Sequence, residues 1–313
     1  MIPASFDYEV AESAAHALTL LAEHGEDAKL LAGGHSLLPM MKVRLAQPAV
    51  LIDIARVTEL AGIRTEGEEL VIGATTRHAD VAGSELVNAE APILAYAAAQ
   101  VGDPQIRHRG TIGGSLAHAD PSADLPMTLL ALGGSVEITG PSGVRTVAAD
   151  DFFTGPFESV LSPDELLSAV RVPRGGSVPW GYQKFVRRAN DWAIVGVAAY
   201  DGRVALASMG GTPLRALATE EALRSGAPAA RAPPPATTCT PTRTTASTWP
   251  ASSPAVRWRA RRADVARALP PALPPHPRIE VCGPPASSCE VSGPHTSYFR
   301  CCGPAYGISA CHG

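Results

Sequence analysis

The chain has 313 residues, which is enough for two domains and a sizeable core. Its formal net charge is −4 and aromatic residues make up 5% of it, so neither bulk charge nor stacking side chains favour nucleic-acid binding. No apolar run has the length of a membrane span, and the first Lys or Arg is Lys29. We therefore expect a cytoplasmic protein with no secretory signal and no membrane span.

The six cysteines all lie between Cys239 and Cys311, and the first 238 residues contain none. Residues 1–238 therefore cannot hold a thiolate-ligated iron–sulfur cluster or a cysteine-based zinc site. The six cysteines form no C-x-x-C pair, and no acid–base dyad or nucleophile motif is evident upstream of them. The sequence predicts no catalytic residue and no metal site.

The N-terminal segment is predicted to form a small βαβ unit. Ser13 is placed to cap a helix over 13–24 that ends at Gly25. The elements expected after it are a strand over 29–31, a glycine turn over 32–36, a helix over 40–45 and a strand over 50–54. This unit lacks G-x-G-x-x-G, so a doubly wound dinucleotide fold is not predicted.

Strands and helices are mixed without regular alternation from residue 58 to residue 173, which predicts an α+β fold. Gly140–Gly143 separates two strands of a predicted hairpin. The expected strands are 69–73, 135–138, 144–147 and 166–172, and the expected helices are 76–81, 92–101 and 127–132.

A linker over 174–180 is predicted to lead to a smaller segment with three strands and a helix. These are expected at 182–187, 193–200, 203–209 and 218–223, with Asp201-Gly202 as a hairpin turn. From about Ala230 the composition changes to Pro, Arg, Ala, Thr, Ser and Cys without periodicity. We interpret residues 230–313 as an out-of-frame translation of GC-rich DNA; a natural low-complexity, disordered tail is the alternative, and resequencing the gene near codon 230 distinguishes the two.

Two paired-glycine segments are the strongest candidates for a binding site. The first is Ala32-Gly33-Gly34-His35-Ser36, and the second opens with Thr111-Ile112-Gly113-Gly114-Ser115. Glycine pairs let a backbone approach a ligand closely, and successive N–H groups in a turn bind anions such as phosphate. The basic residues Arg107-His108-Arg109 precede the second segment and favour a polyanionic ligand. Either pair alone is also typical of an ordinary tight turn, and the basic loop is also typical of a solvated surface.

Taken together, residues 30–54 and 100–126 resemble the two FAD-binding segments of the medium, flavoprotein subunit of molybdenum-containing hydroxylases. Among these the medium subunits of aerobic carbon monoxide dehydrogenases are the most similar, and the resemblance covers about residues 1–225. It implies an α+β, two-lobed FAD-binding domain of the PCMH/vanillyl-alcohol-oxidase type at 1–175, with lobes at about 1–57 and 58–175. It also implies that 180–229 is the start of an incomplete α+β C-terminal domain, with a three-stranded antiparallel sheet packed on helices.

The resemblance further implies a set of residues that bind FAD, with the two glycine segments holding the pyrophosphate and ribityl region largely through backbone N–H groups. Asp124 would bind a hydroxyl, and Lys184 would be a cation near the pyrimidine edge of the flavin. The implied residues are Leu30, Leu31, Ala32, Gly33, Gly34, His35, Ser36, Leu37, Thr111, Ile112, Gly113, Gly114, Ser115, Asp124, Leu167 and Lys184. His118 and Asp120 lie inside the second segment, where turn-stabilising roles are as well supported as ligand contact.

By the same resemblance, this chain is an electron-transfer subunit. A large subunit with a molybdenum cofactor would oxidise the substrate, and a small subunit with two [2Fe–2S] clusters would relay the electrons to FAD here. The external acceptor would be a quinone or NAD, and the assembly a heterotrimer, possibly dimerised. A stand-alone FAD oxidoreductase is one alternative; a non-enzymatic nucleotide-binding or assembly module, or an inactive truncated remnant, is the other. Bound flavin and co-purifying cluster-bearing subunits would separate these possibilities.

Overall fold

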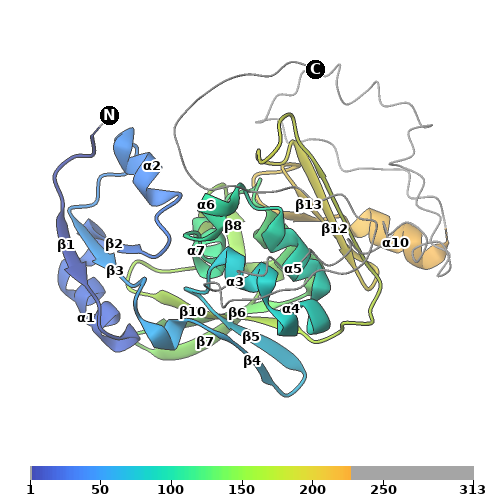
Figure 1. Cartoon of the computed structure of the whole chain (residues 1–313), viewed down its shortest axis with the longest axis horizontal. Helices are drawn as coiled ribbons and strands as arrows, with labels where there is room; N and C mark the ends of the chain where they lie inside the picture. The colour runs from blue at the N-terminus through green and yellow to red at the C-terminus, as the bar shows by residue number, and fades with distance from the viewer. Residues whose placement is uncertain (1, 227–313) are drawn as a thin grey trace, which may run out of the picture. The chain divides into compact units, whose positions relative to one another are not determined.

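A computed structural model describes residues 2–226 (Figure 1). The mixture of helices and strands confirms the α+β class. The predicted tail at 230–313 and the last three residues of the predicted 180–229 segment lie outside the described residues.

The N-terminal segment forms a three-stranded parallel sheet in the order β1-β3-β2. Its strands are β1 (Asp7–Val10), β2 (Ala28–Leu31) and β3 (Val50–Asp53), with α1 (Ala14–His24), a 3-10 turn (Gly25–Asp27) and α2 (Leu37–Lys42) between them. As predicted, the Ser13 hydroxyl caps α1, accepting the His16 N–H at 3.0 Å, and Gly25 ends the helix. The parallel β2–β3 pair confirms the βαβ unit.

Two predictions for this segment were wrong. Strand β1 was missed because it is short and exposes Tyr8 and Val10, so it shows no apolar alternation. The helix expected at 40–45 begins at Leu37 instead, because Pro39 falls in its first turn, where a missing N–H costs nothing.

The next segment forms a five-stranded antiparallel sheet in the order β4-β5-β10-β6-β7. The strands are β4 (Ile63–Glu66), β5 (Glu69–Gly73), β6 (Ser135–Gly140), β7 (Gly143–Ala148) and β10 (Leu166–Pro173), and β8 (Phe153–Gly155) pairs with β9 (Glu158–Ser159). The predicted β6–β7 hairpin is confirmed. A 3-10 turn (Thr58–Leu60) precedes β4, and the helices are α3 (His78–Gly83), α4 (Glu85–Glu90), α5 (Pro92–Ala99), α6 (Pro104–Arg107), α7 (Ile112–His118), α8 (Asp124–Leu132) and α9 (Ala149–Phe152).

Helix α8 lies at the centre of the main core, and all nine of its residues are buried. It packs against α5 and against two strands of the C-terminal sheet, β12 and β13, so no face of it is left for water. This explains why its sequence has no polar stripe. The buried helix predicted at 127–132 is confirmed, but it begins at Asp124, one turn earlier.

The C-terminal described segment forms a four-stranded antiparallel sheet in the order β11-β12-β13-β14, followed by α10. The bounds are β11 (Trp180–Phe185), β12 (Val195–Tyr200), β13 (Arg203–Ala207), β14 (Leu214–Arg215) and α10 (Leu217–Ser225). Asp201 and Gly202 have φ values of 47° and 79°, as the predicted hairpin requires. The sheet expected to have three strands gains β14, which is two residues long and gives no periodic signal.

Arg171 on β10 links its own strand to three others of the five-stranded sheet, β4, β5 and β6. From β10, its Nε donates to Glu137 at 2.6 Å, while Nη1 and Nη2 donate to Glu69 at 3.1 Å and to Glu66 at 2.7 Å. The arginine side chain is only 19% exposed, so these bonds are partly shielded from water. Hydrogen bonds from Arg171, and then from Arg64, lower the pKa of Glu66.

We expect Arg171→Met to lower the melting temperature at pH 7 by several degrees, because three carboxylates lose their shared cation. A carboxylate with a depressed folded-state pKa stabilises the fold above its ordinary pKa, and this contribution is lost as the pH falls. The deficit measured by calorimetry should therefore shrink below pH 4.5, the unshifted pKa of Glu66. Arg64→Met, which removes an exposed pair, is the control and should change little. A deficit that is constant from pH 7 to pH 3.5 would contradict this account.

Candidate cofactor site

The first glycine segment is an anion-receptive loop between β2 and α2. Over the described range, the four N–H groups from Gly33 to Ser36 have no hydrogen-bond acceptor in the protein. Gly34 has a φ of 76°, a conformation that favours glycine, and His35 and Ser36 are exposed. A run of unsatisfied N–H groups at one loop is suited to a phosphate-type anion.

The first glycine segment touches the loop that leads into the second one. A Cβ built on Gly33 would lie 2.5 Å from the Arg109 carbonyl oxygen and 2.8 Å from the Gly110 Cα. Both neighbours are backbone atoms, which cannot swing away as a side chain can. Glycine at position 33 is therefore required for two segments far apart in sequence to lie side by side.

The second glycine segment is the first turn of α7 rather than the tight turn that the sequence predicted. Its N–H groups already have partners: Ile112 donates to the Thr76 carbonyl, Gly113 to the Ala74 carbonyl and Gly114 to the Thr111 hydroxyl. A Cβ on Gly113 would lie 2.5 Å from that of Ala74, so this glycine serves the packing of α7. The resemblance implied contacts mainly through N–H groups; here Gly114, exposed and without a side chain, and the Ser115 hydroxyl are the groups available to a ligand.

The connection from β5 to α3 lies against this second segment. The His78 N–H donates to the Gly110 carbonyl at 3.0 Å, and the guanidinium of Arg77 donates to the Arg109 carbonyl at 2.5 Å. His78 is buried, its Nδ1 has no partner, and burial, helped by nearby His35, Arg77 and Arg107, lowers its pKa to about 4. His78 is therefore a neutral imidazole at pH 7. The sequence showed Arg77 and His78 only as part of a helix start and gave no sign of this contact.

Asp124 and Lys184, both predicted site residues, form a buried ion pair. Lys184 Nζ lies 2.8 Å from Asp124 Oδ2, and their side chains are 9% and 8% exposed. The Tyr182 hydroxyl donates to the other carboxylate oxygen, and Lys184 also donates to the Gln100 carbonyl at 3.1 Å. Burial raises the pKa of Asp124, while Lys184 and Tyr182 oppose that shift. Lys184 is thus charge-balanced inside the protein, and Tyr182 is a member of the cluster that sequence reasoning missed.

The remaining predicted residues flank these groups or support the fold. Leu30 and Leu31 end β2, Leu37 begins α2, and Leu167 is a core residue of β10 beside a bulge. Arg107 closes its own loop by donating to the carbonyls of Val101 and Gly102, so it is not a free cation. Asp120 accepts the Ser122 N–H at 2.8 Å, which gives it the turn-stabilising role considered for it.

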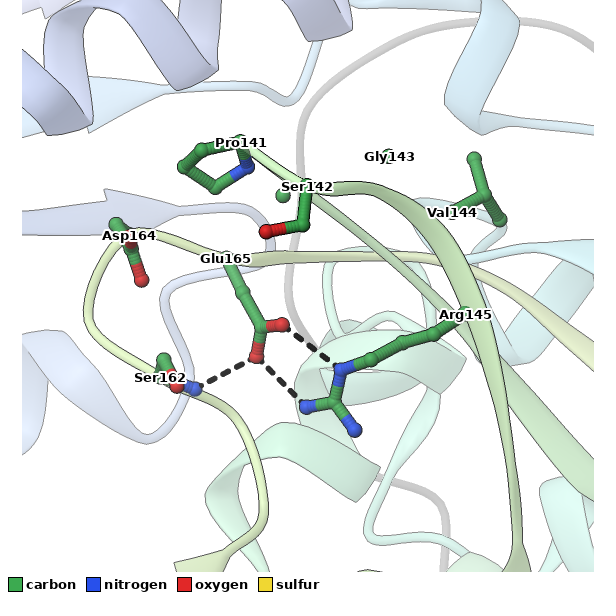
Figure 2. A pocket seen from close by; sticks show the side chains of 9 residues that line it. Pro141, Ser142, Gly143, Val144, Arg145, Ser162, Asp164 and Glu165 are labelled. Carbon is green, nitrogen blue, oxygen red and sulfur yellow. Dashed lines mark hydrogen bonds and ion pairs between the residues drawn. The ribbon is translucent and has the colours of Figure 1, made fainter.

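A cavity of about 220 Å³ lies elsewhere, at the β6–β7 hairpin (Figure 2). Its arginine, Arg145, is bound in bidentate fashion by Glu165, with both N–O distances at 2.8 Å. Glu165 also accepts the Ser162 N–H, so the charges of Arg145 and Glu165 are already satisfied. None of the predicted site residues lines it, and it is not the candidate site.

Between residues 2 and 226, no group of three His, Cys, Asp or Glu side chains is arranged to hold a metal ion. The same part of the chain contains no helix with the length and apolarity needed to cross a membrane.

We expect Lys184→Met to destabilise the fold by about 3–5 kcal/mol at pH 8, because it leaves the Asp124 carboxylate buried without its cation. A carboxylate whose folded-state pKa is raised loses stability as the pH rises through that pKa, so the deficit should be smaller at pH 5. The double variant Lys184→Met/Asp124→Asn should recover most of the loss. Equal deficits at both pH values, without recovery in the double variant, would show that Asp124 carries no uncompensated charge.

Comparison with known proteins shows the family to which the chain belongs. The FAD binding domain of molybdopterin dehydrogenases matches residues 4–175. The carbon monoxide dehydrogenase medium chain of Hydrogenophaga pseudoflava is 49% identical over 199 residues, which cover 63% of this chain and 69% of that one. Subunit alpha of the 6-hydroxypseudooxynicotine dehydrogenase complex of Paenarthrobacter nicotinovorans is 46% identical over 203 residues, covering 64% and 68% of the two chains.

The fold is also similar to that of a solved relative. A solved structure of the Hydrogenophaga pseudoflava carbon monoxide dehydrogenase superposes with a TM-score of 0.69 at 46% identity, covering 71% of this chain and 81% of that one. The chain therefore belongs to the family of FAD-binding medium subunits of molybdenum-containing dehydrogenases, and it is an oxidoreductase subunit whose cofactor is FAD.

Proposed function

We propose that this chain accepts electrons from the [2Fe–2S] clusters of a small partner subunit and delivers them, through FAD, to an external acceptor, a quinone or NAD. The observation that carries the proposal is the row of four N–H groups from Gly33 to Ser36, unsatisfied within the described residues and held against the loop before α7. A pyrophosphate is the kind of ligand such a loop accepts.

The residues present fit an extended FAD. The first glycine segment would bind the pyrophosphate oxygens. Gly114 and Ser115 would lie along the ribityl region of the cofactor. Lys184 has three N–H donors, of which Asp124 and Gln100 accept two. Within the described structure the third donor has no acceptor, so it is available to the flavin ring, while Asp124 holds the ammonium in place. FAD supplies the electron-transfer chemistry when bound, and the protein supplies orientation and electrostatics.

The distribution of cysteines is consistent with electrons that come from clusters on another subunit. Residues 1–238 have no cysteine, so this part of the chain cannot ligate a cluster of its own. We infer that the clusters belong to another subunit, and the molybdenum centre to a third, large subunit. Relatives named for carbon monoxide dehydrogenase and for 6-hydroxypseudooxynicotine dehydrogenase are about equally similar to this chain. We infer that the large subunit, rather than this one, selects the substrate.

As part of this proposal we keep the predicted domain boundaries: a FAD-binding domain at 1–175, with lobes meeting near residue 57, and the start of a second domain at 180–229. The family match at residues 4–175 supports the first boundary. We retain the interpretation of 230–313 as an out-of-frame segment, which the resequencing proposed above tests directly.

The proposed site is tested by titrating the purified full chain with FAD, monitored by flavin fluorescence. Gly33→Ala and Gly113→Ala should each weaken binding by up to roughly 150-fold, because the backbone must shift to relieve overpacking, whose cost of about 1–3 kcal/mol sets the upper limit of the loss. Gly83→Ala is the matched control: a Cβ at Gly83 meets no atom within 4 Å, so FAD affinity should be unchanged. Absence of FAD binding by the folded wild-type chain would refute the proposal and favour an inactive remnant.

The electron-transfer role has its own test. Co-expression with candidate large and small subunits should yield a complex in which substrate bleaches the flavin absorbance, whereas substrate added to the isolated chain should not. Flavin bleaching by substrate in the isolated chain would instead favour a stand-alone oxidoreductase.

A further inference from the structure

Arg77 holds together two parts of the proposed site that are remote in sequence. It immediately precedes α3, and its Nη1 donates to the carbonyl of Arg109 at 2.5 Å. That same carbonyl oxygen packs against Gly33 of the first glycine segment, where a Cβ would come within 2.5 Å of it. One guanidinium therefore fixes the backbone atom that the first segment needs as its support.

Arg77 lies among charged groups and backbone hydrogen bonds. Arg77 is half-buried, and the neighbouring Arg109 repels it, while Asp80 and Asp53 attract it. Two backbone hydrogen bonds flank the Arg77 bond and join the same two segments: the His78 N–H donates to the Gly110 carbonyl, and the Ile112 N–H donates to the Thr76 carbonyl. The His78 ring lies directly beneath Gly110, where a Cβ would come within 2.7 Å of it. Residues 109–112 are thus strapped to the start of α3, and Arg77 makes the only side-chain hydrogen bond in this strap among the described residues.

We propose that Arg77 is a positioning residue that sets the spacing between the two glycine segments, and so makes one bipartite site for a ligand that spans both. The inference rests on the proposed FAD site and adds a residue outside both glycine segments. A ligand that spans two linked subsites gains affinity from their fixed spacing, whereas a ligand that reaches only one subsite does not.

The test compares FAD with its two halves, ADP and FMN, on the full-length chain. Arg77→Met should weaken FAD binding about 10- to 100-fold, as expected for loss of a charge-assisted hydrogen bond, and should alter the visible circular dichroism of bound flavin. The affinities of ADP and FMN, measured as competitors of FAD, should stay within about twofold of wild type. Arg77→Lys retains a donor and should restore part of the FAD affinity.

Arg64→Met is the control, because Arg64 forms an exposed ion pair with Glu66 on β4 and lies outside the strap. Unchanged FAD binding in Arg77→Met, when the wild type binds FAD, overturns this inference alone. Equal losses for FAD, ADP and FMN, together with a lower melting temperature and no rescue by lysine, also overturn it, because they indicate a general structural role. Absence of FAD binding by the wild type overturns the proposed function, and this inference with it.

Discussion

The contact between Gly33 and the backbone of Arg109 and Gly110 is the constraint on which the site depends. It brings the end of β2, in the parallel sheet, against the loop that begins α7, which packs on the five-stranded sheet. A methyl group at position 33 has no room, because its neighbours are main-chain atoms. The two segments named by the sequence therefore lie side by side because of close packing, and the N–H groups of the first segment have no acceptor within the described residues.

Within the described residues, the proposed site has unpaired donors at the glycine loops and paired, buried charges around Asp124. At the glycine loops the donors are neutral N–H groups and the exposed side chain of Arg109, which suit an anion. Around Asp124 the charges are buried and matched, with Lys184 and Tyr182 brought by β11 of the C-terminal sheet to the start of α8. That sheet thus completes the proposed site by supplying the ammonium and by satisfying the carboxylate. A carboxylate this deeply buried would be costly without both partners.

Much of the fold could be predicted because local signals and tertiary packing agree. Ser13 and Gly25 mark the ends of α1, and the hairpins at 140–143 and 201–202 have the turn residues that their backbones require. The errors arise where tertiary contacts outweigh the local pattern. Strand β1 is held by pairing with β3 rather than by its own pattern. Gly113 and Gly114 predict a turn because glycine disfavours helices, but Gly113 packs against Ala74 within α7.

For the proposed site, sequence resemblance named the glycine segments, Asp124 and Lys184, but not the residues that hold them in place. Arg77, His78 and Tyr182 act across 32, 32 and 58 positions of sequence, and no local pattern encodes such contacts. The sequence also does not show that Nδ1 of His78 is buried without a hydrogen-bond partner among the described residues. Residues that contact a cofactor leave a motif, whereas residues that position those contacts depend on tertiary structure.

The most direct measurement is amide hydrogen exchange on the full chain with and without FAD. The account predicts that FAD protects the amides of Gly33 to Ser36, which have no acceptor within the described residues, and leaves Gly113 and Gly114, already bonded to protein acceptors, nearly unchanged. Protection confined to the second glycine segment, or to neither segment while FAD is bound, would contradict it.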